Sequence, residues 1–200
     1  MRLRRLIARY VRFEDAFVPV AFFLIVVSLS VFGAGPERDT LVQIGPGTLW
    51  TAALLAFLLP VGTIFARDLE AGVLDQLRVG GLAFETIAAA RILGLYISVA
   101  LPLLAACVLA SVLMPGGTAL LGPAFPVGFM ALAALSVAAG ALIAGARGGE
   151  ALAGLLILPL ALPVLIFGAG GEFRLLAAAT LVLVVTAPFA AAAALRAAEA

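Results

Sequence analysis

Residues 67–85 read RDLEAGVLDQLRVGGLAFE, and the rest of the chain is organised around this stretch. It carries six charged residues in 19 positions, whereas the whole chain has only 12 basic and 11 acidic residues. Its apolar residues recur at helical spacing, and two adjacent glycines follow them as a helix stop signal. The stretch therefore predicts a short amphipathic helix between two long apolar runs. From spacing alone, that helix is either a solvated loop or the place where a soluble partner acts on a membrane domain.

The composition of the chain indicates an integral membrane protein. Of its 200 residues 65% are hydrophobic and only 12% are charged, and the mean hydropathy is +1.26. A soluble domain of this length cannot cover so much apolar surface with so few charges. All the basic residues are arginines, because the sequence contains no Lys and no His. A P-loop needs a Lys to reach the nucleotide phosphates, so we do not expect this chain to hydrolyse ATP.

The positions of the charges divide the chain into membrane spans. A spanning helix needs about 20 apolar residues, and the uncharged block 92–146 is long enough for two. A cluster of Gly and Pro between residues 115 and 126 marks the turn between them. We therefore predict an all-α fold in which residues 1–200 form a single transmembrane domain. Its six predicted spans cover about residues 17–34, 48–66, 86–114, 127–146, 151–169 and 175–195.

The N-terminal residues 1–15 predict an amphipathic, basic helix that lies in the plane of the membrane interface. The alternative is the start of a secretory signal peptide. Glu14 and Asp15 interrupt the positive flank, and the uncharged block 16–36 is longer than the usual signal-peptide core of about 7–15 residues, so an uncleaved first span is favoured. The predicted membrane-surface residues of this helix are Arg2, Arg5, Arg9 and Arg12.

The distribution of arginines predicts the orientation. With the N-terminus inside, ten arginines face the cytoplasm and only Arg38 and Arg174 face the other side, so both termini are expected to be cytoplasmic. Arg91 lies just inside the third span, where it is either an anchor that reaches the interface or a functional intramembrane charge. Trp50 falls near the outer end of the second predicted span, and we expect it to be an interfacial aromatic residue.

The spans lack the groups that catalysis in a membrane requires. They hold no Asp, Glu or His in their interiors, and their serines have no neighbouring general base. Enzymes and ion-driven transporters need such polar groups at membrane depth. The single cysteine, Cys107, lies in an uncharged run and is expected to be a packing residue. We therefore expect a non-catalytic subunit that is moved by a separate energised protein.

Several phrases of the sequence match one family in the right order and at the right spacing. The phrases are FFLIVVSLSVFGAGPE at 22–37, IGPGTLWTAALLA at 44–56, FARDLEAGVLDQLRVGGL at 65–82, RGGEALAGLLILPLALPVLIFGA at 147–169 and TAPFAAAAALR at 186–196. Over nearly its whole length the chain resembles the haem exporter protein B (CcmB) family, the membrane permease of the cytochrome c maturation ABC complex. LDQL at 74–77 is also similar to the coupling segment of ABC-2-type permeases. The last outer loop, 170–174, is shorter than in some members.

The resemblance implies a six-helix permease of the bacterial cell inner membrane that works as a pair, with a second copy of itself and two copies of an ABC ATPase subunit. It also implies contacts with a haem-binding membrane subunit, a small single-span subunit and a periplasmic haem chaperone. The chain itself is expected to contact the lipid bilayer and not to bind nucleic acid. We expect no directly bound cofactor, because ATP belongs to the partner and haem is a candidate cargo. Without His, only three Met, Cys107 and two Tyr could ligate haem iron, and none has a paired partner.

The predicted mechanism places residues 67–85 against the partner ATPase. Its apolar residues would dock in a cleft of the ATPase or against the span ends, and its charged residues would make rim contacts. The predicted ATPase-coupling residues are Asp68, Leu69, Glu70, Val73, Leu74, Asp75, Leu77 and Arg78. A second, smaller cytoplasmic contact is predicted at Arg147, Gly148, Gly149 and Glu150. Two other functions stay open: a generic ABC-2 exporter of another lipid or small molecule, and a non-transporting scaffold that drives release of haem-loaded chaperone.

Overall fold

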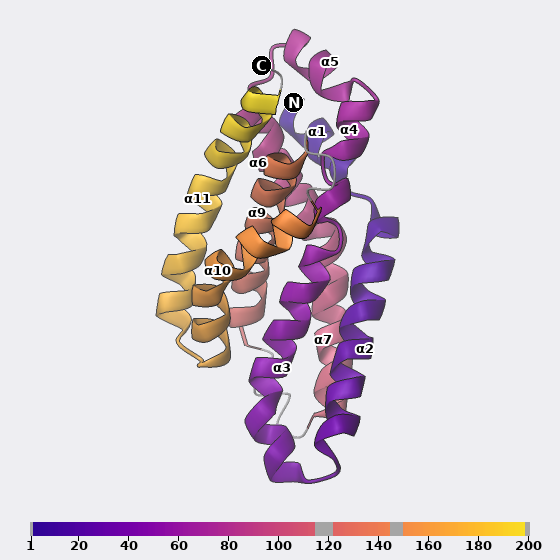
Figure 1. The fold of residues 1–200 in the computed structure, drawn as a ribbon, viewed down its shortest axis with the longest axis vertical. Coiled ribbons are helices and arrows are strands. Elements are labelled where there is room, and N and C mark those ends of the chain that lie inside the picture. Colours follow the sequence, from indigo (N-terminus) through magenta and orange to yellow (C-terminus); the bar gives the residue numbers. More distant parts are fainter. Residues whose placement is uncertain (1, 115–121, 145–149, 199–200) are drawn as a thin grey trace.

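The computed structural model describes residues 2–114, 122–144 and 150–198, and the regular elements of these ranges are helices (Figure 1). The α-helices are α1 (Arg2–Tyr10), α2 (Phe17–Ala34), α3 (Arg38–Leu58), α4 (Ala66–Glu70), α5 (Val73–Val79), α6 (Phe84–Leu95), α7 (Leu101–Leu113), α9 (Ala124–Ile143), α10 (Glu150–Ala169) and α11 (Phe173–Ala198). Two 3-10 turns, η1 (Phe13–Ala16) and η2 (Val61–Thr63), and a π-helical turn, η3 (Tyr96–Ala100), connect them.

The helices pack around α9, which contacts α3, α6, α10 and α11. Its small residues Ala134 and Ala141 are buried, so they serve packing within the chain. The long α2 lies beside α3 and α7 (Figure 1). Helices α4 and α5 lie at the same end of the molecule as both termini, whereas the turn between α2 and α3 lies at the opposite end (Figure 1). One end therefore gathers the N-terminal helix, the C-terminal helix end and the charged segment.

Within the described ranges, five helical stretches are long and apolar enough to cross a membrane, which supports an all-helical, multi-pass protein. They are Phe13–Ala34, Arg38–Glu70, Phe84–Leu113, Ala124–Ile143 and Phe173–Ala198. At the fifth predicted span, 151–169, the structure has α10, of which Ile157–Ala169 is recognised as a shorter apolar helix. Pro159 and Pro163 lie inside α10, and this helix runs obliquely to α11 (Figure 1). A span at residues 151–169, which would bring the total to six, stays a prediction.

The helix that holds the second predicted span begins ten residues before the predicted start of that span. Helix α3 starts at Arg38 and continues through Pro46, although Gly45, Pro46 and Gly47 are typical of a turn. The regular α-helix then ends at Leu58, before Pro60, and the chain continues through the 3-10 turn η2. The regular helix therefore starts and ends before the predicted span 48–66 does, and the bounds of the span itself stay a prediction.

This shift also overturns the prediction for Trp50, which is buried rather than interfacial. Trp50 lies in the body of α3 with only 2% of its surface exposed. Its ring stacks on Phe125 with the ring centroids 4.8 Å apart, and the edge of Phe129 meets it at 6.2 Å. Gly128 and Gly168 leave room for it, because a Cβ atom at either position would lie within 2.4 Å of a Trp50 ring carbon. Trp50 is thus a central packing residue between α3, α9 and α10.

Candidate functional site at the end of the helix bundle

The charged segment 67–85 folds as two helices, so the prediction of one continuous amphipathic helix is wrong. Helix α4 ends at Glu70 and α5 begins at Val73, and Gly72 between them has a left-handed backbone with φ of 62°. Residues with a side chain rarely adopt that conformation, so this glycine sets the position of the break. The residues predicted to share one helix are therefore divided between two short helices.

The predicted helix stop at Gly80 and Gly81 is confirmed. Gly81 has φ of 79°, and its N–H donates to the Arg78 carbonyl at 2.8 Å. The Leu82 N–H donates to the Leu77 carbonyl at 3.1 Å. These two bonds form a Schellman motif, which satisfies carbonyls at the end of α5 and reverses the chain toward α6.

The apolar residues of the segment face the chain's own helices. Val73 and Leu74 are buried, with 9% and 2% of their surfaces exposed, and Leu69 and Leu77 pack partly buried against the same core. The sequence left two docking places open for these side chains, a cleft of the ATPase and the ends of the spans. In this structure they pack at the ends of the spans. Glu70 and Asp75 are exposed, and Val79 at the tip of α5 is exposed to 91%. Arg78 is exposed but also lies over the Phe84 ring, 4.9 Å from its centroid.

Arg91 is held inside this end of the molecule by Tyr10 from the N-terminal helix. The Arg91 guanidinium carbon lies 4.6 Å from the centroid of the Tyr10 ring, and Arg91 donates a hydrogen bond to the Ile64 carbonyl. Tyr10 is almost completely buried, and α1 can approach α6 closely because Gly94 has no side chain. Arg91 is therefore covered by α1 and does not extend freely to the interface.

Asp68 is the third group at this junction. The Tyr10 hydroxyl and the Asp68 Oδ2 atom are both buried, and neither has a hydrogen-bond partner among the described residues. Burial, and then the negative charge of Asp68, raise the pKa of Tyr10 to about 12. Tyr10 therefore stays neutral at any physiological pH. A cavity of about 300 Å³ adjoins this group and is also lined by Asp15, Thr63 and Arg67.

Ion pairs join the remaining elements at this end. Arg67 of α4 pairs with Asp15 of η1 at 3.3 Å, and Arg196 near the end of α11 pairs with Glu85 of α6. Exposed ion pairs contribute only about 0–1 kcal/mol each, so they fix relative position more than they add stability. Tyr10, Asp15, Glu85 and Arg196 were not predicted as site residues. The only sequence signal for the last three was a charge placed at the edge of an apolar run.

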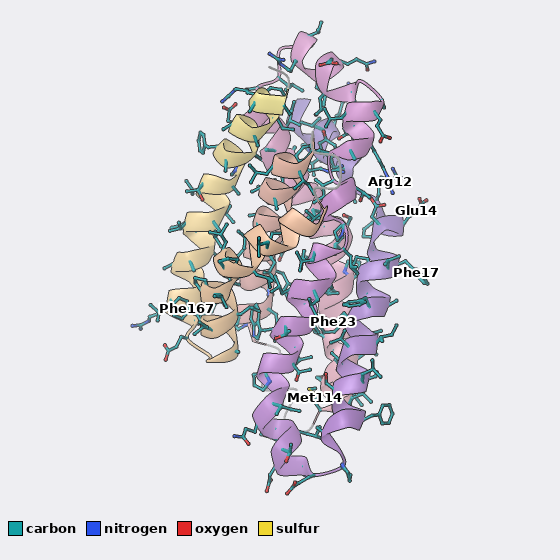
Figure 2. All side chains as sticks on the ribbon, viewed as in Figure 1. Arg12, Glu14, Phe17, Phe23, Met114 and Phe167 are labelled. Atoms are coloured by element: carbon teal, nitrogen blue, oxygen red, sulfur yellow. The ribbon has the colours of Figure 1, made fainter. Side chains whose placement is uncertain are left out.

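The predicted membrane-surface residues lie on the outside of the N-terminal region. Arg5, Arg9 and Arg12 are exposed, and Arg12 pairs with Glu14 at 3.6 Å. Figure 2 shows Arg12, Glu14 and Phe17 pointing outward at the start of α2. The side chain of Arg2 lies outside the described residues. The same holds for the predicted second contact, since Arg147, Gly148 and Gly149 are not described and only the backbone of Glu150 is, at the start of α10.

A family model described as CcmB protein matches residues 2–198 of the chain. The chain belongs to the CcmB family. Its similarity to heme exporter protein B of Paracoccus denitrificans is 42% identity over 196 residues, covering 88% of each chain. The protein of the same name from Rhodobacter capsulatus is 41% identical over 192 residues, again with 88% of each chain covered. That from Bradyrhizobium diazoefficiens is 36% identical over 200 residues, covering 90% of this chain and 89% of the relative.

The CcmB match confirms the family expected from the sequence phrases. It runs from the start of α1 almost to the end of α11, so the N-terminal helix and the charged segment both belong to the family region. Among the described residues of this CcmB-family chain, no three His, Cys, Asp or Glu side chains gather around a candidate metal site.

Proposed function

We propose that the chain is the membrane permease subunit of an ABC transporter that exports or handles haem for cytochrome c maturation. The single observation that carries this proposal is the match to heme exporter protein B proteins across nearly the whole of both chains. The chain is not the catalytic subunit, because ATP hydrolysis belongs to a separate ATPase protein. It binds no cofactor itself, ATP is bound by the partner, and haem is the cargo of the complex.

The proposed assembly contains two copies of this chain and two copies of the ATPase. It also includes a haem-binding membrane subunit, a small single-span subunit and a periplasmic haem chaperone, and it involves no nucleic acid. In the proposed topology, six spans cross the bacterial inner membrane and both termini are cytoplasmic. The ten-to-two distribution of arginines supports this orientation, as does the gathering of both termini with α4 and α5 at one end (Figure 1).

In the proposed mechanism, the ATPase contacts the exposed side of α4 and α5 and moves the spans through the buried side. Glu70, Asp75 and Val79 form the outward surface, on which Val79 is an apolar anchor with charged neighbours. Leu74, with the partly buried Leu69 and Leu77, passes the movement to the helix bundle, because these side chains are packed against its core. The contact at residues 147–150 remains part of the proposal as a second, smaller docking point.

A specific observation also favours the scaffold function, in which the chain moves a neighbouring protein and no haem passes through it. The buried hydroxyls of the helices are occupied by backbone carbonyls: Ser98 donates to Gly94 at 2.8 Å, and Ser136 donates to Phe57 and Leu132, each at 2.9 Å. These groups offer little to the propionates of a passing haem. The two functions differ in whether haem crosses the permease pair in the absence of the chaperone.

The proposed process can be tested by deleting the gene for this chain in its native bacterium. Haem staining of membrane and periplasmic fractions should reveal no c-type cytochromes, and a plasmid copy should restore them. Normal c-type cytochromes in the deletion strain would contradict the proposal and favour a generic exporter of another molecule. Haem uptake by inverted vesicles that hold the permease and ATPase alone would then separate transport from the scaffold function.

The docking surface can be tested with Val79→Asp, followed by co-purification of the ATPase with the tagged chain. Val79 is exposed, so the change leaves the fold intact while placing a charge on the apolar anchor. Loss of such an anchor weakens an interface by about 2 kcal/mol or more, and we expect at least tenfold less ATPase to be retained. Ala83→Asp is the matched control, since it adds the same charge at the N-cap of α6, where Asp is favoured. Equal retention by both variants would exclude the α5 tip as the contact.

A further inference from the structure

A second groove lies between the N-terminal helix and the end of the charged segment. It has a volume of about 420 Å³, is open on one side and is formed by α1 and by the turn that follows α5. Its lining residues are Arg5, Leu6, Arg9, Leu77, Gly80 and Leu82. Arg5 and Arg9 are one helical turn apart, a spacing that puts neighbouring side chains about 5–6 Å apart at their Cβ atoms. Two guanidinium groups can therefore approach one ligand from the same side.

The charge of this groove is positive and uncompensated. Among the described residues, its lining contains two arginines and no acidic side chain, and both arginines are exposed. Within the described part of the chain, neither Arg5 nor Arg9 forms an ion pair, whereas Arg67 pairs with Asp15 and Arg196 pairs with Glu85. Arginine binds phosphate with strong, paired hydrogen bonds. The ligand that complements these two groups is an anion, and a phosphate oxyanion fits their geometry.

The rest of the groove is apolar and lies at the edge of the spans. Leu6 is buried, Leu77 and Leu82 are partly buried, and the three side chains provide a hydrocarbon surface beside the guanidinium groups. Leu82 also lies two positions before Phe84, where the candidate span Phe84–Leu113 begins. A ligand in this groove would meet cations and hydrocarbon together at the level where a span enters the membrane. This combination matches a phospholipid better than a free anion.

We propose that this groove binds an anionic phospholipid, with the phosphate of its head group between Arg5 and Arg9 and its glycerol and upper acyl chain against Leu77 and Leu82. The bound lipid then links α1 to the turn after α5, because these two elements form the opposite walls of the groove. The proposal does not depend on the cargo of the transporter. It requires only that α1 lies at the membrane interface, as its buried Leu6 and exposed arginines indicate.

Native mass spectrometry of the full-length chain in detergent tests the proposal, with phosphatidylglycerol as probe and phosphatidylcholine as the zwitterionic comparison. The wild-type chain should retain phosphatidylglycerol in preference to phosphatidylcholine. The double variant Arg5→Gln, Arg9→Gln should bind it about 30-fold more weakly, since each arginine near an anionic lipid surface contributes roughly a factor of five. Arg4→Gln, Arg38→Gln removes the same number of charges from exposed positions outside the groove and should retain most of the affinity.

Four results would overturn the proposal. Equal weakening by both double variants would mean diffuse attraction to basic residues, and full binding by Arg5→Gln, Arg9→Gln would place the lipid elsewhere. Displacement of phosphatidylglycerol by equimolar inorganic phosphate would indicate a free-anion site. Loss of the lipid when the ATPase is present would assign the groove to a protein partner. Size-exclusion profiles and unfolding temperatures of the variants should match the wild type, because the exchanged side chains are on the surface.

Discussion

Tyr10 and Arg91 show, at the scale of single residues, how a cation is kept at the edge of an apolar helix bundle. Arg91 donates a hydrogen bond to the Ile64 carbonyl, and its guanidinium carbon lies 4.6 Å from the centroid of the Tyr10 ring. A cation–π contact of this kind contributes about 0.5–2 kcal/mol. The buried Tyr10 hydroxyl has no hydrogen-bond partner in the described structure, so the ring rather than the hydroxyl carries the interaction.

The raised pKa of Tyr10 predicts a loss of stability in alkali. Between the ordinary pKa of 10.0 and the folded value of about 12, the unfolded chain releases a proton that the folded chain keeps. The free energy of unfolding should therefore be unaffected by this group below pH 10 and should fall above it by about 1.4 kcal/mol per pH unit. Chemical unfolding in detergent between pH 9 and 11 measures this, with Tyr10→Phe as control because it keeps the ring. An identical pH dependence in wild type and Tyr10→Phe would contradict the prediction.

At the scale of elements, Trp50 joins three helices that are distant in the sequence. The indole reaches from α3 into the space left by glycines on α9 and α10, and it stacks on Phe125. Such close approach of helix backbones to a large ring depends on the absence of side chains at Gly128 and Gly168. The arrangement explains how the oblique α10 is held close to α3 at this point.

Gly128→Ala should destabilise the protein through Trp50. The new Cβ atom would lie 2.3 Å from the Trp50 Cη2 atom, so helix α9 or the ring has to move, at a cost of roughly 1–3 kcal/mol. Gly47→Ala is the matched control on α3, because a Cβ atom there meets nothing within 4 Å. Thermal unfolding in detergent measures both, and Trp50→Leu should restore much of the loss in the Gly128→Ala background. Equal stability of the two glycine variants would show that Trp50 is not confined.

For the whole molecule, the ion pairs of the described residues and the Arg91 contacts lie at the end that carries α1, α4 and α5. The opposite end carries the α2–α3 turn (Figure 1). Arg38 begins α3 after that turn, and Arg174 lies near the start of α11. The positive-inside rule predicts that the end of a membrane protein at which the cations gather faces the cytoplasm, and this supports the proposed orientation.

Cysteine labelling tests this orientation with little background, because the single native Cys107 is buried. A Val79→Cys chain should react with a membrane-impermeant maleimide in inverted vesicles and stay unlabelled in intact spheroplasts. A Glu37→Cys chain, with its cysteine between α2 and α3, should behave in the opposite way. Labelling of Val79→Cys from outside the cell would reverse the proposed topology. Both positions are exposed, so neither change affects folding.

The apolar helices and the helix stop at Gly80 and Gly81 could be predicted from the sequence, because hydropathy and glycine pairs are local signals. The start of α3 could not, since Gly45, Pro46 and Gly47 form a turn in water but continue as helix in an apolar setting. A span predicted to start at residue 48 places Trp50 near its end, whereas α3 starts at Arg38 and has Trp50 in its body. Only the packing of α9 and α10 reveals that it is central.

The charged segment was located from its sequence, but its orientation was not. The apolar spacing through residues 69–77 predicts one helix, because a single glycine is tolerated inside helices. In the structure Gly72 instead adopts a left-handed backbone and divides the segment. The contact between Tyr10 and Arg91 joins α1 to α6, and no local pattern links residues so distant in sequence. Which side of a short helix faces its own protein depends on such tertiary contacts.

The break at Gly72 makes α5 a lever. Its first turn is fixed by buried Val73 and Leu74, whereas the Val79 side chain near its far end is exposed, so the fulcrum lies directly beside the break. The arm between them is about 8 Å long, from five residues at 1.5 Å each. A load on the tip then produces torque at the buried turn, with little translation of the whole segment. Motion of a few ångströms outside the membrane would reach the bundle as a small rotation of two side chains.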